Sequence, residues 1–324
     1  LIKTEREEFF LVLFSLLNHL LNKIMKKIKI LLSALVLMSS SIVFGQQDPQ
    51  YTQYMYNMNI LNPAYAGSMG VGSIGLLGRT QWVGVEGAPQ TFTVSAHAPF
   101  GNNLGVGLSV IHDEIGPAKE DNLYLDVSYT LRVSEEGRLA FGIKGGVTFL
   151  DVRQFITVDP DPLNVPVNQT SPNFGAGLYY YTDKFYLGLS APNFLETTHL
   201  EKGNGSVSTA SEKMHYFLTS GYVFDIADNL KLKPSTMVKA TAGAPLSIDL
   251  SANLLIDEKF EIGVSHRLDD SISGLLGFQV NRDFRIGYAY DYTMTRFGDF
   301  NSGSHEIMLL FNFNRRNLKS PRFF

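Results

Sequence analysis

YLDVSYTLRV, residues Tyr124–Val133, alternates without a break from Leu125 onward. Its apolar members are Leu125, Val127, Tyr129, Leu131 and Val133, and its polar members are Asp126, Ser128, Thr130 and Arg132. A period of two is typical of a β-strand with one apolar and one polar face. The same alternation recurs in Leu246–Ile256, Phe260–Ser265 and Phe284–Tyr292. These stretches predict an all-β protein.

Extending the search along the chain gives fourteen such segments, most of them nine to thirteen residues long. A tilted membrane strand needs about 9–11 residues, whereas strands of soluble proteins average about 5–6. The pattern therefore predicts a transmembrane antiparallel up-and-down β-barrel over 71–314, with about 14 strands; twelve or sixteen strands are the alternatives. The segments are 71–83, 90–98, 104–113, 121–133, 138–150, 173–182, 184–191, 214–224, 230–241, 245–256, 258–268, 272–281, 283–293 and 304–314.

A soluble β-sandwich or a lipocalin-like barrel also alternates, but its apolar face would line a filled core. In a membrane barrel the apolar face contacts lipid, the polar face lines the lumen, and aromatic residues gather at the two interfaces. Here the polar face carries Gly, Ser, Thr and charge, and aromatic residues occur toward strand ends. We expect Tyr179–Tyr181 and the group Tyr288, Tyr290 and Tyr292 to belong to such aromatic girdles.

The amino-terminal region resembles an export signal. Met25 is followed by lysines, an apolar run from Ile30 to Met38, and small Gly45, which is the pattern of a secretory signal peptide at 25–45. We interpret 1–24 as a start-site artefact, with an anchor helix as the alternative. After Gly45 the longest unbroken apolar run is Ile307–Phe311, far short of the roughly 20 residues of a membrane helix.

Composition excludes several kinds of protein. The 324 residues include no Cys, which excludes disulfide scaffolds, thiolate metal sites and thiol catalysis. The formal net charge of −4 argues against a general nucleic-acid binder. No serine-hydrolase or metalloprotease motif occurs, so neither an enzyme nor a cofactor is expected. His112, Asp113 and Glu114 could be metal ligands, but a solvated strand end is the favoured interpretation.

Two long links interrupt the strand pattern, at Asp151–Pro172 and Asn193–Lys213. Outer-membrane barrels keep periplasmic turns short and extracellular loops long, so both links are candidates for the outer face. The segment 46–70 has no clean period, and we expect it in the lumen or at the periplasmic mouth. The glycines Gly101, Gly105 and Gly107 are interpreted as residues that let barrel strands bend, in preference to a phosphate loop.

The segment 46–57 (QQDPQYTQYMYN) runs into Asn62–Gly67 (NPAYAG), and Arg79–Trp82 and Gly87–Thr91 follow. The chain closes with Leu318–Phe324. Together these stretches resemble the PorP/SprF family of type IX secretion system membrane proteins, over 46–324. The resemblance implies an outer-membrane barrel serving a system that exports proteins with a C-terminal sorting domain. Its partners would be components of that system and a secreted, adhesin-like protein.

The resemblance leaves two roles open. One branch of the family is tied to the periplasmic ring of the motor-driven apparatus, and the other is paired with particular secreted adhesins, including those of gliding motility. A small-solute transporter or porin remains the alternative from the barrel alone. The candidate plug and family motif comprises Tyr54, Met55, Asn62, Pro63, Ala64, Tyr65, Ala66 and Gly67. The candidate machinery contact is the basic tail with Arg315, Arg316, Lys319 and Arg322, for which a solvated tail is the alternative.

Overall fold

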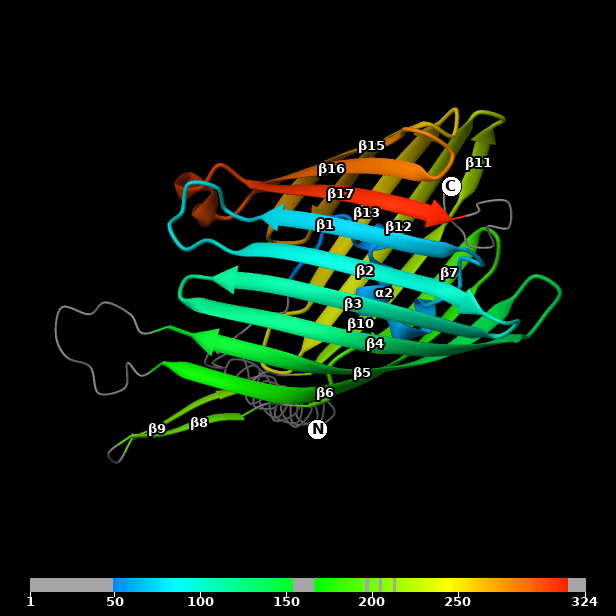
Figure 1. Cartoon of the computed structure of the whole chain (residues 1–324). Coiled ribbons are helices and arrows are strands. Elements are labelled where there is room, and N and C mark those ends of the chain that lie inside the picture. Colours follow the sequence, from blue (N-terminus) through cyan, green and yellow to red (C-terminus); the bar gives the residue numbers. More distant parts are fainter. Residues whose placement is uncertain (1–48, 154–165, 196–197, 204–205, 212–213, 314–324) are drawn as a thin grey trace, which may run out of the picture. The chain divides into compact units, whose positions relative to one another are not determined.

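The computed structural model describes residues 49–153, 166–195, 198–203, 206–211 and 214–313 (Figure 1). The predicted signal peptide, the segment 1–24 and the basic tail lie outside these ranges. No helix among the described residues is long and apolar enough to cross a bilayer. The elements are η1 (Tyr54–Tyr56), α2 (Met58–Leu61), η2 (Pro63–Tyr65), β1 (Gly72–Thr80), β2 (Gln90–Phe100), β3 (Leu104–Ile115), β4 (Ala118–Arg132), β5 (Arg138–Val152), β6 (Val167–Tyr181), β7 (Phe185–Ala191), β8 (Thr198–Gly203), β9 (Ser206–Ser211), β10 (His215–Tyr222), β11 (Phe224–Ala227), β12 (Leu230–Thr241), β13 (Ser247–Ile256), β14 (Phe260–Arg267), β15 (Ser271–Gln279), β16 (Phe284–Thr293), η3 (Arg296–Phe300) and β17 (Ser304–Phe313).

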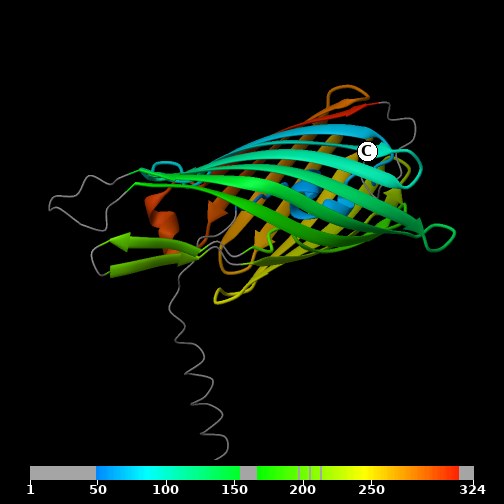
Figure 2. The same ribbon diagram turned by 60° about the horizontal axis from the view of Figure 1, so that its bottom comes forward.

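The strands close into an antiparallel barrel (Figures 1 and 2). Strands β1 to β7 and β12 to β17 pair with their neighbours in sequence, β7 pairs with β10, β10 pairs with β12, and β1 pairs with β17. Strand β11 continues β10 after a break at Val223, and both lie against β12, so together they fill one place in the ring. The ring therefore has fourteen places, which confirms the predicted architecture, and β8 and β9 form a separate hairpin.

The two faces of the wall are inverted relative to a soluble protein. On β4 the exposed side chains are Leu123, Leu125, Val127, Tyr129 and Leu131, whereas Asn122, Asp126 and Ser128 are buried. A polar interior and an apolar exterior are the arrangement of a barrel whose outer face contacts lipid, because lipid does not penalise exposed apolar surface. The protein is thus an outer-membrane β-barrel.

The two ends of the barrel carry links of different length. One end, here called the short-turn end, has links of two to five residues, at 101–103, 133–137, 182–184, 228–229, 257–259 and 280–283. The other, the long-loop end, carries 81–89, 116–117, 153–166, 192–214, 242–246, 268–270 and 294–303. Strand β1 begins at the short-turn end, and strand β17 ends there. By the usual arrangement of outer-membrane barrels, the short-turn end is periplasmic.

The first predicted long link is shorter than expected, and the second contains regular structure. Strand β5 runs on to Val152 and β6 begins at Val167, so the first long link is 153–166. The polar residues Asn168, Gln169 and Thr170 form strand because each has a partner on β5, and backbone pairing outweighs their turn-like composition. The second long link, 192–214, contains the hairpin β8–β9 rather than only irregular chain.

Candidate functional site

The residues from Pro49 to Gly70, here called the lumen segment, lie inside the barrel (Figure 2, blue). They form three short helical turns, η1, α2 and η2. Asn62 begins the last turn, since its side chain accepts a hydrogen bond from the Ala64 amide and Pro63 occupies the first helical position. Helices this short are unstable alone, so the conformation depends on contacts with the wall.

The lumen segment carries no charge, since no Asp, Glu, Lys or Arg occurs between Pro49 and Gly78. Its side chains are almost completely buried. Strand residues of the wall are the hydrogen-bond partners of most of its polar groups, and its other side chains make apolar contacts. Tyr65 illustrates the apolar part, because its ring packs edge-on against Tyr179 and His97, with centroids 5.3 Å apart in both cases.

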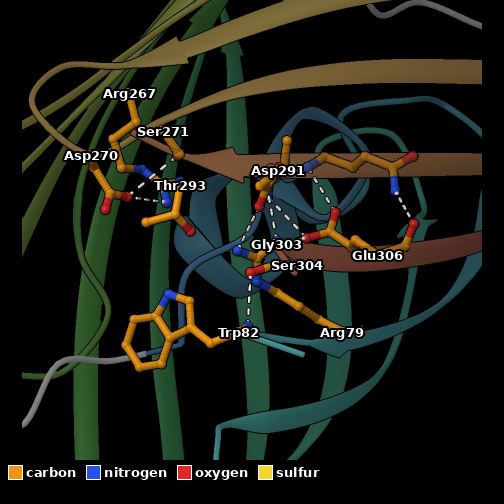
Figure 3. Close-up of polar contacts among 12 residues, drawn as sticks. Arg79, Trp82, Arg267, Asp270, Ser271, Asp291, Thr293, Gly303, Ser304 and Glu306 are labelled. Carbon is orange, nitrogen blue, oxygen red and sulfur yellow. Dashed lines mark hydrogen bonds and ion pairs between the residues drawn. The ribbon is translucent and has the colours of Figure 1, made fainter. Parts of the chain in front are cut away.

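The first anchor of the lumen segment lies where β1, β16 and β17 meet (Figure 3). Arg79 forms ion pairs of 2.7 Å with Asp291 and 3.1 Å with Glu306, and all three side chains are buried. Thr52 donates its backbone amide to Glu306 Oε2 at 2.9 Å and its hydroxyl to Asp291 at 2.8 Å. The Gln53 amide donates to Glu306 Oε1 at 2.8 Å. The segment is thus fixed to the seam between the first and last strands.

A second anchor surrounds Tyr56. Its hydroxyl contacts the Glu261 carboxylate, which also receives hydrogen bonds from Arg285 and Asn253. Cations lie over the ring, with Arg285 Cζ 5.3 Å and Lys233 Nζ 5.6 Å from its centroid. Such contacts favour an electron-rich aromatic ring at this position.

A third anchor lies on β4 and β5. Asn59 donates to Asp126 Oδ2 at 3.1 Å, and Lys144 pairs with Asp126 Oδ1 at 2.9 Å. Both charged side chains are buried, so removing one of them would leave the other charged and without its partner, which costs several kcal/mol. The buried lumen charges are thus arranged in pairs that the segment completes with neutral groups.

Further hydrogen bonds join the segment to three strands of the wall. The Asn62 side chain donates to the Leu178 carbonyl at 2.9 Å, the Ser190 hydroxyl donates to the Leu61 carbonyl at 2.7 Å, and the Ser128 hydroxyl donates to the Ala66 carbonyl at 2.6 Å. The donors and acceptors belong to β4, β6 and β7. Together with the first anchor on β1, β16 and β17, they attach the segment around much of the ring.

Wall glycines allow the segment to approach the strands closely. A side-chain carbon on Gly142 would collide with the backbone of Pro63 and Ala64, and one on Gly105 would collide with the Ala66 carbonyl. The same holds for Gly177 against Asn62 and Gly287 against Gln53. That Gly105 and Gly107 let the strands bend stays a prediction, and their missing side chains in addition provide room for Ala66 and Asn59. Only Gly101 lies in a turn, at φ 67°.

Two cavities border the segment at the long-loop end. One, of about 40 Å³, is lined by Tyr51, Ile60 and Leu61 together with Glu120 and Asn122. The other, of about 10 Å³, lies between Pro49, Gln50 and Tyr54 on one side and Asp249 and Arg267 on the other. About 10–15 Å³ of space open to the centre of a water molecule is needed for one water, so the smaller cavity holds at most one water and the larger a few.

The predicted site residues fall into two groups. All of the family-motif residues, Tyr54, Met55, Asn62, Pro63, Ala64, Tyr65, Ala66 and Gly67, lie in the lumen segment, and all except Gly67 are buried. Arg315, Arg316, Lys319 and Arg322 lie outside the described residues. The inward charges Arg79, Asp291 and Glu306 were not predicted, although each is an isolated charge on the polar face of a strand and could have been noticed for that reason.

The prediction of aromatic girdles is met only in part. Tyr288 and Tyr292 are exposed on the outer wall, whereas Tyr179 and Tyr181 are only 2% and 3% exposed and point into the lumen. Three consecutive strand residues cannot share a face, so the girdle assignment of Tyr179–Tyr181 is wrong except for Tyr180.

The candidate metal ligands His112, Asp113 and Glu114 have separate partners. Asp113 is buried and accepts a hydrogen bond from Thr91, whereas His112 pairs with Asp121 and Glu114 pairs with Lys119. Among the described residues, no cluster of three His or carboxylate side chains could hold a metal ion.

Comparisons with known proteins place this barrel. A family model described as "Type IX secretion system membrane protein PorP/SprF" matches residues 43–311. No curated protein matches the chain. Among solved structures, the chain is similar to the toluene transporter TbuX of Ralstonia pickettii, at 8% identity and a TM-score of 0.49, over 81% of this chain and 93% of that one. It is also similar to a FadL homologue of Pseudomonas aeruginosa, at 14% identity and a TM-score of 0.44, over 83% and 96%.

Proposed function

The chain belongs to the PorP/SprF family of type IX secretion system membrane proteins, and we propose that it assists the export or surface anchoring of a secreted, adhesin-like protein by binding it. The family identifies a non-enzymatic outer-membrane component of this secretion system. That the protein holds a polypeptide, and that this polypeptide is a secreted adhesin, is what we propose beyond family membership.

The filling of the lumen carries this proposal. A ring of fourteen strands is wide enough for a conduit when empty, since eight strands already enclose a side-chain-filled interior. Here the lumen segment is anchored to β1, β16 and β17 by the ion-pair network at Arg79, to β4 and β5 by the pair of Asp126 and Lys144, and to β6 and β7 by further hydrogen bonds. The two cavities that border it at the long-loop end have room for a few waters at most. A holding role is therefore favoured over passage through the barrel.

The long-loop end provides the surface for holding. The links 153–166 and 192–214 both belong to this end, and loops on a rigid scaffold commonly carry recognition. The wall beneath them is held by continuous strand pairing from β3 to β6, in which β4, β5 and β6 each have 15 residues. We expect the secreted partner to contact these two links.

Deletion of the protein tests the role. If it is dedicated to one adhesin, the deletion strain loses one or a few large surface proteins while general secretion continues. If it serves the periplasmic ring, all proteins with the C-terminal sorting domain fail together. Quantitative surface proteomics of the deletion strain distinguishes the two.

Two controls sharpen this test. A variant that lacks 154–165 but keeps the barrel should reproduce the loss of the partner, whereas Glu135→Ala, in a short turn at the opposite end, should not. An unchanged surface proteome, together with altered uptake of a small solute and open-pore conductance in planar bilayers, would show instead that the protein is a porin.

A further inference from the structure

Strand β6 has an unpaired edge at the long-loop end of the barrel. It begins at Val167, but its pairing with β7 starts only at Ala176, which lies opposite Ala191. Residues 167–175 pair with β5 on one side and, within the described chain, with no strand on the other. The hairpin in the link 192–214 does not provide the missing neighbour, because β8 and β9 pair only with each other. The wall therefore presents a strand edge next to both long links.

Alternate residues direct their backbone groups toward this edge. The Phe174 carbonyl accepts a hydrogen bond of 2.7 Å from the amide of Phe194, which follows β7 in the chain. Because the backbone groups of successive strand residues point to opposite sides, the even-numbered residues Asn168, Thr170 and Pro172 also face the edge. Pro172 has no amide hydrogen, and proline inside a sheet is confined to positions whose amide has no ladder partner. The position of this proline agrees with an unpaired edge.

The open part of the edge lies outside the apolar band of the barrel. On the outer face of β6, Phe174 is 55% exposed, whereas the exposed residues before Pro172 are the polar Asn168 and Thr170. Pro172 and the hydrogen bond at Phe174 close the edge toward the membrane. Residues 167–171 therefore remain open on the extracellular side, where a polypeptide can reach their backbone groups.

This edge has little of the protection that natural sheets give to exposed edges. Such edges usually carry charged side chains, prolines or bulges, which prevent pairing with another chain. Residues 167–175 (VNQTSPNFG) include no Asp, Glu, Lys or Arg, and their pairing with β5 continues without a bulge. Pro172 ends the open stretch but leaves the backbone groups of Asn168 and Thr170 able to form a ladder.

A second copy of the barrel does not fit this edge, because of the strand tilt. Strands of outer-membrane barrels lie about 35–45° from the membrane normal. Two copies that face each other in one membrane are related by a half-turn about that normal, so their β6 strands would cross at roughly 70–90°. Neighbouring strands of a sheet differ in direction by only about 20–25°. Two such edges cannot form a ladder, whereas a polypeptide outside the membrane can align with β6.

We propose that residues 167–171 bind an extended segment of the secreted partner as an additional β-strand. The proposal rests on the proposed function and specifies how the partner is held. In strand addition the main-chain hydrogen bonds provide the affinity, and the side chains alternate between the two faces of the sheet. Those of the added strand would lie beside Thr170 and Phe149 outside and beside Gln169 and Ser171 inside. These neighbours are uncharged, so the segment that fits is an extended and predominantly uncharged stretch.

Proline substitution tests the backbone hydrogen bonds directly. Thr170→Pro removes the amide that faces the open edge, whereas the ladder with β5 uses the odd-numbered residues and stays intact. Thr170→Ala is the matched control, since it removes the same side chain but keeps the amide. Heat-modifiable electrophoresis checks the assembly of both variants. Asn168→Pro, which removes the other edge-facing amide, replaces Thr170→Pro if the latter fails to assemble.

The readout is the surface abundance of the proteins that the deletion strain loses. Thr170→Pro should lower it to the level of the deletion strain, and Thr170→Ala should leave it at the natural level. An assembled Thr170→Pro variant that retains these proteins would overturn the inference, and so would an equal loss with Thr170→Ala. If the deletion strain loses no surface protein, the proposed function fails and the inference falls with it. Loss on deletion together with retention in Thr170→Pro rejects only the added strand.

Photocrosslinking in intact cells locates the contact. A photoreactive amino acid at position 170 should form an adduct that an antibody against one of the lost proteins recognises. Gln90 is the control position, because it is an exposed polar residue at the same end of the barrel, paired on both sides. No adduct at position 170, or equal adducts at both positions, would contradict the proposed edge. Disulfide-linked dimers of Thr170→Cys, in a chain that has no natural cysteine, would also contradict it, because they would place a second copy there.

Discussion

Arg79 on the first strand and Glu306 on the last strand are direct cross-strand partners, and their side chains form a buried ion pair of 3.1 Å across the seam that closes the barrel. The same Glu306 carboxylate accepts the backbone amides of Thr52 and Gln53. One carboxylate therefore joins strand closure to the docking of the lumen segment. The stability of the closed ring and the position of the segment are coupled through this group.

The first prediction concerns this carboxylate. Glu306→Gln removes the charge that pairs with Arg79 and weakens two backbone hydrogen bonds. Breaking a buried pair by neutralising one partner costs about 3–5 kcal/mol, reduced here because Asp291 still pairs with Arg79. We expect the folded, fast-migrating band in heat-modifiable electrophoresis to be lost at a lower temperature. Glu258→Gln is the matched control, since its pair with Lys231 is exposed and is expected to contribute less than about 1 kcal/mol.

The second prediction concerns the fit of the segment against the wall. Gly142→Val should displace the segment, because its side chain would occupy the position of the Ala64 backbone. The expected result is increased protease sensitivity within 49–70 while the barrel remains resistant. Gly274→Val is the control, because nothing lies within 4 Å of that position. Equal protease patterns for the two variants would mean that the close approach at Gly142 is unimportant.

The third prediction concerns passage through the lumen. Deletion of Asn57–Gly67 removes two of the three helical turns, the third anchor and the contacts with β6 and β7. We expect the single-channel conductance in planar bilayers to rise severalfold, while membrane insertion persists because the strand ladder is unchanged. Natural protein that already conducts as an open pore would contradict the filled lumen.

The fourth prediction concerns the two faces of β4. Val127 is 46% exposed on the outer wall, and a cation there at mid-membrane costs about 2–4 kcal/mol. Val127→Arg should therefore reduce the amount of assembled barrel far more than Thr130→Arg, which places the cation on the lumen side. Quantification of heat-modifiable protein in outer-membrane fractions gives the comparison. Similar losses for both variants would contradict the assigned faces.

The strands were predictable because alternation is a local property. All fourteen ring positions correspond to predicted segments, including the short β7. Within each strand, the alternation of apolar and polar residues shows which face contacts lipid. The errors arose where a strand residue contacts the lumen segment, because the strand pattern alone does not show that the lumen is filled. Tyr179 and Tyr181 were assigned to the lipid interface, and the room that Gly105 makes for Ala66 was not predicted, because the sequence pattern does not reveal what fills the lumen.

The sequence predicted which residues form the lumen segment, but not which wall residues they contact. The absence of a period in 46–70, together with the family motif, singled out the right residues for attention, but not their partners. Thr52 and Glu306 are separated by 254 positions, and Tyr56 and Glu261 by 205. Contacts of this kind depend on the register and closure of the whole ring, which no local pattern specifies.

The attachment of Thr52 to Asp291 and Glu306 also bears on when the lumen segment can dock. The lumen segment is synthesised before any strand, yet its partners on β16 and β17 are synthesised last, 239 and 254 positions later. Contacts over such separations form late, because the ordering of the intervening chain must come first. The contacts of Thr52 and Gln53 therefore depend on the last two strands, whereas those of Asn59 and Asn62 need only β4 and β6. The segment can dock fully only once the ring is complete.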